Sequence, residues 1–483
     1  MASTFVSKGI AFVGSIFIAR ILFPADFGYI VFAEIIAGFI MLVANCGFEN
    51  FYLQEKIRDK QHEAEILGVT YKLRLIFNSA LFFLQIGISY LVQYKFGEEI
   101  VGIILRVSAL GHLLNAVTIN RQYVLRKRLD FRIESVGNVA RDAVGTVAKV
   151  GFAFMGLGAV SIAMGAVVGG VARTIIYLAA CRDLPMAKGC KKDIVKRVWH
   201  FGIYSFLSNF VGYFCTYIDK MLLTATFPMS GIGLYAFGSS RAAMVRAYTT
   251  VPLGVLVISW IAKHKGNTDG LLDKIAKMSY LEISIIMPII CLLFGYADYI
   301  IPSVFGSKWA FAVPFFRMFL VLSFVQALTG NLTSVFTGMG YPRLQFLFAF
   351  SFFVCIGGSL FFVSRSGNLF EYALTYVIAC SAFDFVKGHF CARKINASLL
   401  SYLKRSRCLD VLLWSGINGL TIWLIKQYTH SSLLALICSA LAVILIFIVQ
   451  HMYLRRAISV EIIKLVAPRL HEKFLKVLRT RLA

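Results

Sequence analysis

The sequence predicts an all-α polytopic membrane protein with about fourteen transmembrane helices. Its composition is the first indication, because 59% of the 483 residues are hydrophobic and only 15% are charged, far outside the range of soluble domains. The second is the division of the chain into apolar spans, each long enough to cross about 30 Å of hydrocarbon. The third is the sorting of basic residues between alternate connections. Such spans must be helical, because in lipid each backbone amide has to find its partner within its own segment.

The basic residues also predict the orientation of the chain. Of the 49 Lys and Arg residues, 35 lie in alternate connections and the C-terminal tail, and only 4 lie in the intervening connections. Positive charge is retained on the cytoplasmic side, so both termini are expected there. The net charge of +25 therefore indicates topology and contact with an anionic leaflet, not nucleic-acid binding. The predicted spans are 4–22, 29–51, 75–94, 100–119, 136–154, 158–181, 200–226, 231–260, 278–296, 310–337, 346–364, 369–386, 408–425 and 431–453.

An internal repeat predicts how the spans are grouped. The first span runs into Phe23-Pro24 and a Gly turn, and the seventh runs into Phe227-Pro228 and another. Recurrence after six helices favours two parallel six-helix lobes around a central cavity, with substrate bound near the midplane. We treat the first span as helix 1, since no small-residue cleavage site follows it. The expected divisions are an N-lobe (1–181), a basic cytoplasmic connection (182–199), a C-lobe (200–390), helices 13 and 14 (391–453) and a basic tail (454–483).

The tail is expected to be an amphipathic helix lying on the inner leaflet. Apolar residues recur three or four positions apart from Ile463 to Val477, with Lys and Arg between them. A solvated tail without a membrane contact is the alternative.

Ten basic residues lie inside the spans, where bilayer insertion does not account for them. Charged side chains at this depth are costly, and they commonly mark a substrate path or an ion pair. Arg241 and Arg246 fall near the middle of helix 8, and one of them could instead pair with a carboxylate such as Asp219. The remaining candidates for a substrate-binding cavity are Lys149 in helix 5, Arg106 and Arg317 near the outer ends of helices 4 and 10, and Arg20 and Lys220 at the outer ends of helices 1 and 7. Anchoring at the membrane interface is an equal alternative for the last two.

Acidic residues in the spans are candidates for ion coupling or charge pairing. Glu34, Asp142 and Asp219 are the principal ones. Asp142 and Lys149 share a helix face, so they form either a polar stripe along a cavity or a structural ion pair. Gly165 and Gly169 precede Arg173 at fourth-residue spacing, which predicts close helix packing without a ligand. No metal-ligand spacing is found among the Cys residues, so no metal or cofactor is expected.

Several stretches resemble the Wzx-type oligosaccharide flippases. These belong to the multidrug/oligosaccharidyl-lipid/polysaccharide (MOP) exporter superfamily, which also holds the MATE multidrug antiporters and the lipid II flippases. The stretches that carry the resemblance are Ala19–Gly28, Arg126–Arg132, Gly156–Ala159, Tyr217–Leu223 and Gly231–Tyr235. They follow one another in order along nearly the whole chain. The chain departs from the family pattern at Phe23, where members usually have Gly.

The resemblance implies a MATE-like fold and a multi-pass protein of the bacterial plasma (inner) membrane. It implies transfer of a polyprenyl-pyrophosphate-linked oligosaccharide, such as an O-antigen, capsule or exopolysaccharide repeat unit, from the cytoplasmic to the outer leaflet by alternating access. The implied partners are this lipid-linked substrate, membrane lipids, and a polysaccharide polymerase and chain-length proteins. A cationic cavity suits such a cargo, because Arg and Lys bind phosphate oxygens.

Three other function classes, an organic-cation antiporter, a membrane enzyme and an ATP-driven pump, fit the sequence less well. A MATE-like antiporter of organic cations is the alternative, but ten cations against seven acids within the spans favour an anionic cargo. A membrane enzyme is disfavoured because no connection between spans exceeds about twenty residues, too short for the extramembrane domain that membrane glycosyltransferases need. No Gly-Lys dipeptide occurs, so the chain lacks a P-loop and is not by itself an ATP-driven pump.

Overall fold

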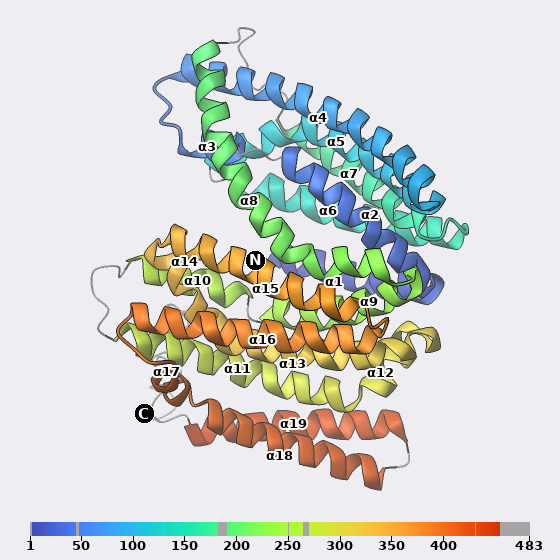
Figure 1. Cartoon of the computed structure of the whole chain (residues 1–483), viewed down its shortest axis with the longest axis vertical. Coiled ribbons are helices and arrows are strands. Elements are labelled where there is room, and N and C mark those ends of the chain that lie inside the picture. The colour runs from blue at the N-terminus through green and yellow to red at the C-terminus, as the bar shows by residue number, and fades with distance from the viewer. Residues whose placement is uncertain are drawn as a thin grey trace, which may run out of the picture. The chain divides into compact units, whose positions relative to one another are not determined.

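The computed structural model describes residues 2–44, 48–128, 130–181, 191–249, 251–263, 270–429 and 431–454. Within these ranges the chain forms nineteen α-helices and one short 3-10 helix and contains no strand, which confirms the all-α prediction (Figure 1). The helices are α1 Ala2–Ile21, α2 Pro24–Ala44, α3 Phe48–Gln54, α4 Lys60–Phe96, α5 Glu99–Lys127, α6 Arg132–Phe154, α7 Val160–Ala180, α8 Lys192–Thr226, α9 Met229–Thr249, α10 Val251–Lys263, α11 Leu271–Gly295, α12 Ala297–Phe305, the 3-10 helix Ser307–Ala312, α13 Val313–Thr333, α14 Val335–Met339, α15 Pro342–Ser364, α16 Leu369–Lys394, α17 Leu399–Arg405, α18 Cys408–Tyr428 and α19 Ser432–Leu454.

Each predicted span falls on one helix or on two consecutive helices. In the described residues, ten helical segments are long and apolar enough to cross a membrane. The predicted span 29–51 is divided between α2 and α3, 231–260 between α9 and α10, and 310–337 chiefly between α13 and α14. The number of crossings and the orientation of the termini stay predictions. The basic tail from residue 455 and residues 182–190 of the predicted inter-lobe connection lie outside the described residues.

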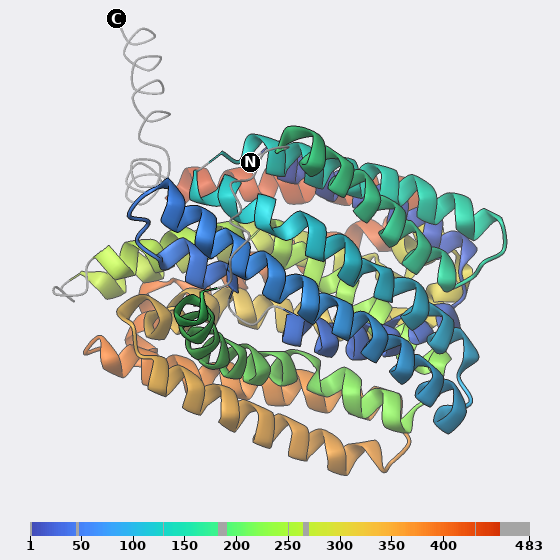
Figure 2. The ribbon, with the colours of Figure 1, turned by 90° about the horizontal axis from the view of Figure 1, so that it is seen from above.

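The contacts divide the chain into two compact units. Unit 1 comprises residues 1–236, 304–309 and 353–369, and unit 2 comprises 237–303, 310–352 and 370–483. In unit 1, α4 runs alongside α5, and α6 alongside α7, as Figures 1 and 2 show. In unit 2, α11 packs against α13 and α18, and α18 packs against α19.

The two repeated Phe-Pro turns lie against one another in unit 1. A Cβ added to Gly28 would lie 2.0 Å from the carbonyl oxygen of Met229, and one added to Gly233 would lie 1.7 Å from that of Pro24. Only glycine leaves room for backbones to approach so closely. The start of α2 thus packs on the start of α9 reciprocally, as expected where two copies of one motif meet.

Two helices extend well beyond their predicted spans at the basic end of unit 1. α4 has 37 residues, so it is about 55 Å long, and α8 has 35. Their extensions bury a cluster of apolar side chains with α3 and the end of α5. Lys127 donates to the backbone oxygens of Tyr52 and Glu55 at 2.7 and 2.9 Å. Burial, together with a hydrogen bond to Glu63, raises the pKa of the Tyr52 hydroxyl, which therefore stays a protonated donor.

Candidate functional site

Three charged side chains from three helices of unit 1 influence one another electrostatically, without forming ion pairs among themselves. Glu34 on α2 lies within electrostatic range of Lys220 on α8 and Lys149 on α6. The Lys220 ammonium also lies 5.4 Å from the centroid of the Tyr217 ring, one turn earlier on α8. Lys149 also interacts with Asp142 on α6, and Lys220 with Asp219 on α8, so the two lysines lie among three carboxylates. Ammonium groups held in the interior of a protein can bind an anionic group through charge-assisted hydrogen bonds.

The close packing of α6 on α7 fixes the position of Lys149. A Cβ on Gly165 would lie 2.2 Å from Cγ of Lys149, and one on Gly169 would lie 2.5 Å from the backbone oxygen of Arg141. Gly145 on α6 faces the same two glycines, with its added Cβ 3.1 Å from the oxygen of Gly165. These contacts confirm the predicted small-residue packing face. The Lys149 stem lies over Gly165, so the glycines also determine where the ammonium group sits.

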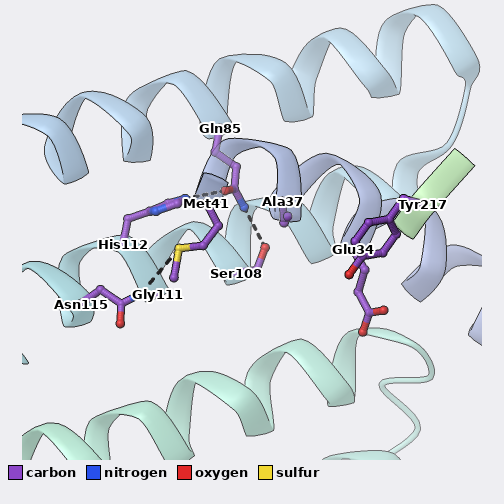
Figure 3. A pocket seen from close by; sticks show the side chains of 10 residues that line it. Glu34, Ala37, Met41, Gln85, Ser108, Gly111, His112, Asn115 and Tyr217 are labelled. Atoms are coloured by element: carbon purple, nitrogen blue, oxygen red, sulfur yellow. Dashed lines mark hydrogen bonds between the residues drawn. The ribbon is translucent and has the colours of Figure 1, made fainter. Parts of the chain in front are cut away.

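A cavity of about 420 Å³ has Glu34 in its lining. It lies between α2, α4, α5 and α8, and its lining is mostly uncharged (Figure 3). In this view Glu34 and Tyr217 lie at one end, and His112 and Asn115 at the other. The lining residues are Glu34, Ala37, Gly38, Met41, Gln85, Ser108, Gly111, His112, Asn115 and Tyr217.

A hydrogen-bond network orients the polar side of this cavity. Gln85 donates from Nε2 to Ser108 Oγ and to the oxygen of Leu105, each at 2.8 Å, and its Oε1 lies 2.7 Å from His112 Nε2. Because Oε1 only accepts, Nε2 of His112 carries the proton and Nδ1 of the neutral ring is an acceptor. Asn115 accepts from Arg173 on α7 at 3.3 Å. Arg173, which the sequence suggested only as part of a packing face, therefore supports the far end of the cavity.

Other predicted residues of unit 1 have partners away from the cavity. Arg141 donates to the Asp142 carboxylate at 2.9 Å, so this pair joins two neighbouring residues of α6 and not two helices. Asp219 is buried and accepts from the Tyr235 hydroxyl at 2.9 Å. Arg20 donates to the backbone oxygen of Val304 at 2.8 Å. Arg106 lies against α4, where it donates to Gln93 at 3.2 Å and lies 4.9 Å from the centroid of the Tyr90 ring.

Three predicted cations lie in unit 2. Arg317 on α13 makes a two-pronged contact with Asp298 on α12, with one N–O distance of 3.1 Å. Arg246 on α9 lies within electrostatic range of Asp384 on α16. The guanidinium of Arg241 lies 4.9 Å from the centroid of the Phe237 ring. Asp384 thus lies near Arg246, whereas Asp219 contacts the same helix, α9, through the Tyr235 hydroxyl.

Sequence reasoning missed the uncharged part of the site. Ser108, His112 and Asn115 follow a spacing of four and three, which places them on one face of α5. Polar side chains on one face of an apolar span were the available signal. It was weaker than the signal of the charges, because an isolated polar residue in a bundle is commonly a helix-packing contact.

Residues 17–314 match the family of polysaccharide biosynthesis proteins, which is more than half of the chain. The chain belongs to this family. The teichuronic acid biosynthesis protein TuaB of Bacillus subtilis (strain 168) is 24% identical over 382 residues, covering 76% of this chain and 75% of TuaB. An uncharacterized membrane protein from the cps region of Klebsiella pneumoniae is 19% identical over 383 residues, or 79% of this chain and 78% of that protein.

Two solved structures share the fold of this polysaccharide biosynthesis protein. The lipid II flippase MurJ in an inward closed conformation superposes with a TM-score of 0.74 at 13% identity, covering 94% of this chain and 98% of MurJ. An inward-facing MATE family transporter of the MOP superfamily gives 0.67 at 15% identity, covering 81% and 98%. The predicted MATE-like fold is confirmed. The protein is a multi-pass membrane protein of the bacterial inner membrane, and its fold is one that a lipid II flippase and a MATE family transporter share.

Proposed function

We propose that this protein is a flippase that moves a polyprenyl-pyrophosphate-linked oligosaccharide, the repeat unit of a surface polysaccharide, from the cytoplasmic to the outer leaflet by alternating access. The observation that carries the proposal is that Lys149 on α6 and Lys220 on α8 are half-buried in unit 1 and form no ion pair with a described residue, although both interact electrostatically with Glu34. Crossing hydrocarbon with an unpaired pyrophosphate would cost several kcal/mol or more per charge, so a flippase needs cations in the interior of the protein.

Membership in the polysaccharide biosynthesis family and a fold shared with MurJ support the same class of cargo. Under this proposal the two lysines bind the pyrophosphate, and Glu34 holds them in place when the cargo is absent. Arg241 and Arg246, on α9, are proposed to contribute further positive charge to the binding of the cargo. A polysaccharide polymerase and chain-length proteins remain the expected partners downstream.

The test is transport of a fluorescent polyprenyl-pyrophosphate-linked saccharide in proteoliposomes. Replacing Lys149 or Lys220 by Met should each lower the initial rate about tenfold or more, because a charge-assisted hydrogen bond contributes about 1.5–3 kcal/mol. Lys95→Met is the matched control, since Lys95 is exposed at the end of α4, and it should transport as the native protein does. Native rates from both interior variants would refute the proposed role of the lysines.

A MATE-like antiporter of organic cations is the second candidate. It is favoured by one feature of the cavity, the carboxylate of Glu34 beside the Tyr217 ring, because a cation binds an acid and an aromatic face. Export of a cationic dye that depends on an imposed ion gradient, and that Glu34→Gln abolishes, would support this function in place of the flippase.

A further inference from the structure

The cavity beside Glu34 contains polar groups whose hydrogen-bonding capacity is incompletely used. His112 is only 4% exposed, and its Nδ1 atom has no hydrogen-bond partner among the described residues. The amide of Asn115 donates only to the Sδ atom of Met41, at 3.8 Å, among those residues. A buried acceptor without a partner costs about 1–3 kcal/mol. A site that retains such groups is suited to a ligand that supplies the partners.

We infer that this cavity receives the sugar residue attached directly to the pyrophosphate of the cargo, an inference that rests on the proposed function. Sugar hydroxyls both donate and accept, so a sugar that extends along the cavity can bond to the Glu34 carboxylate at one end and to the His112 acceptor and the Asn115 donor at the other (Figure 3). An acyl chain would leave these groups without partners. A phosphate inside the cavity would meet the Glu34 carboxylate without either lysine, because Lys149 and Lys220 do not line the cavity.

The position of the cavity fits the connectivity of such a cargo. Glu34 belongs both to the lining and to the group formed with Lys149 and Lys220. A diphosphate bound by the lysines would therefore place the sugar bonded to it at the Glu34 end of the cavity. Tyr217 lines the same end, and its ring gives a flat apolar surface against which a sugar face can pack.

The size of the cavity indicates how much of the glycan is recognised. At about 420 Å³ it lies near the lower end of the range of ligand pockets, roughly 300–1,000 Å³. It suits a single sugar, and it leaves the remainder of an oligosaccharide outside. Sites that hydrogen-bond a hydroxyl discriminate strongly against ligands that lack it. The first sugar would then determine selection, whereas the rest of the repeat unit could vary.

Gly111 offers a way to fill the cavity without disturbing the fold. A Cβ added there meets nothing within 4 Å, and the residue lines the cavity. Gly111→Leu would project a side chain into the space that the sugar needs, while a helix interior tolerates Leu better than Gly. Gly87 on α4 is the matched control, because it is exposed and also has nothing within 4 Å of an added Cβ.

The experiment measures binding to the full-length protein in nanodiscs. The probes are undecaprenyl pyrophosphate itself and undecaprenyl pyrophosphate carrying one glucose, galactose, N-acetylglucosamine or N-acetylgalactosamine. At least one glycosylated probe should bind native protein about tenfold or more tighter than the bare lipid. Gly111→Leu should abolish this preference and leave binding of the bare lipid unchanged, which also shows that the variant is folded. Gly87→Leu should retain both the preference for the glycosylated probe and the binding of the bare lipid.

Each other outcome has a definite meaning. A preference for the sugar that survives Gly111→Leu would overturn the inference and leave the flippase proposal intact. Equal binding of all five probes by the native protein would overturn it as well. Loss of bare-lipid binding in Lys149→Met, together with a sugar preference in the native protein, would support both the proposed function and the inference about the cavity. Failure of the native protein to bind any probe would count against the proposed function itself.

Discussion

The partners of a cation inside the bundle separate an ion-binding role from a structural one. Lys149 and Lys220 both interact electrostatically with Glu34, and also with Asp142 and Asp219 respectively, but neither lysine forms an ion pair with a described residue. Arg317, in contrast, is matched by the two oxygens of Asp298, and it also donates to the backbone oxygen of Phe294 at 3.0 Å. A cation that is fully paired has little capacity left for a phosphate.

The Arg317–Asp298 pair is predicted to stabilise the fold more than it assists transport. Arg317→Gln and Asp298→Asn should each lower the free energy of unfolding by about 1 kcal/mol or less, since both side chains are partly exposed. The double variant should lose no more than either single one. Thermal unfolding and proteoliposome transport measure the two effects. Transport lost in Arg317→Gln but kept in Asp298→Asn would instead assign Arg317 to the cargo path.

The residues of the site differ in how far the sequence predicted them. Glu34, Lys149 and Lys220 were all named as candidates, because a charge within an apolar span is a strong signal. His112 and Asn115 were not, although they lie on one face of α5. Their role depends on Gln85 from α4 and on Arg173 from α7, and no spacing within α5 predicts which residues of other helices meet that face.

At the scale of helices, glycine spacing determines which faces pack closely. The sequence predicted a small-residue face on α7, and the structure gives it a partner, the Gly145 face of α6. The backbone oxygen of Arg141 lies where a Cβ of residue 169 would be. This contact leaves no space for any side chain.

Gly169→Val is therefore predicted to push α6 and α7 apart. Overpacking at such a contact costs about 1–3 kcal/mol, and the shift would also displace Lys149. The variant should lose thermal stability in detergent and elute as aggregate on size-exclusion chromatography. Gly151→Val on α6 is the control, because its added Cβ meets nothing within 4 Å and the residue is exposed. Equal stability of the two variants would contradict the packing role of Gly169.

The lengths of α4 and α8 were underestimated from hydropathy alone. Hydropathy locates only the part of a helix that lies in lipid. α4 begins at Lys60, where the Asp59 side chain accepts from the backbone amide of His62 at 2.6 Å. Beyond the apolar part, the extension is stabilised by this cap and by burial of Ile66 and Leu67 against α3 and α8. Those contacts are tertiary, so the predicted span began at residue 75.

For the whole molecule, the distribution of basic residues predicts which connections face the cytoplasm. We expect a Cys introduced at Ser366, in an outer connection, to react with a membrane-impermeant maleimide in intact cells. A Cys at Lys56, exposed in an inner connection, should react only after permeabilisation. The native protein, which has ten Cys residues of its own, is labelled in parallel, and its signal is subtracted. The reverse pattern would invert the predicted topology and with it the proposed direction of transport.

The sequence by itself determined the all-helical class, the positions of the spans and the charged candidates. Each of these depends on local composition, because insertion into lipid acts on one segment at a time. Only the tertiary structure decided which charges share a partner, which are neutralised in pairs, and where a polar cavity remains open. Those properties depend on helices far apart in the chain meeting at a few ångströms. The physical reason is that insertion into the bilayer depends on the overall hydrophobicity of a span, whereas packing depends on which residues form each face of the helix.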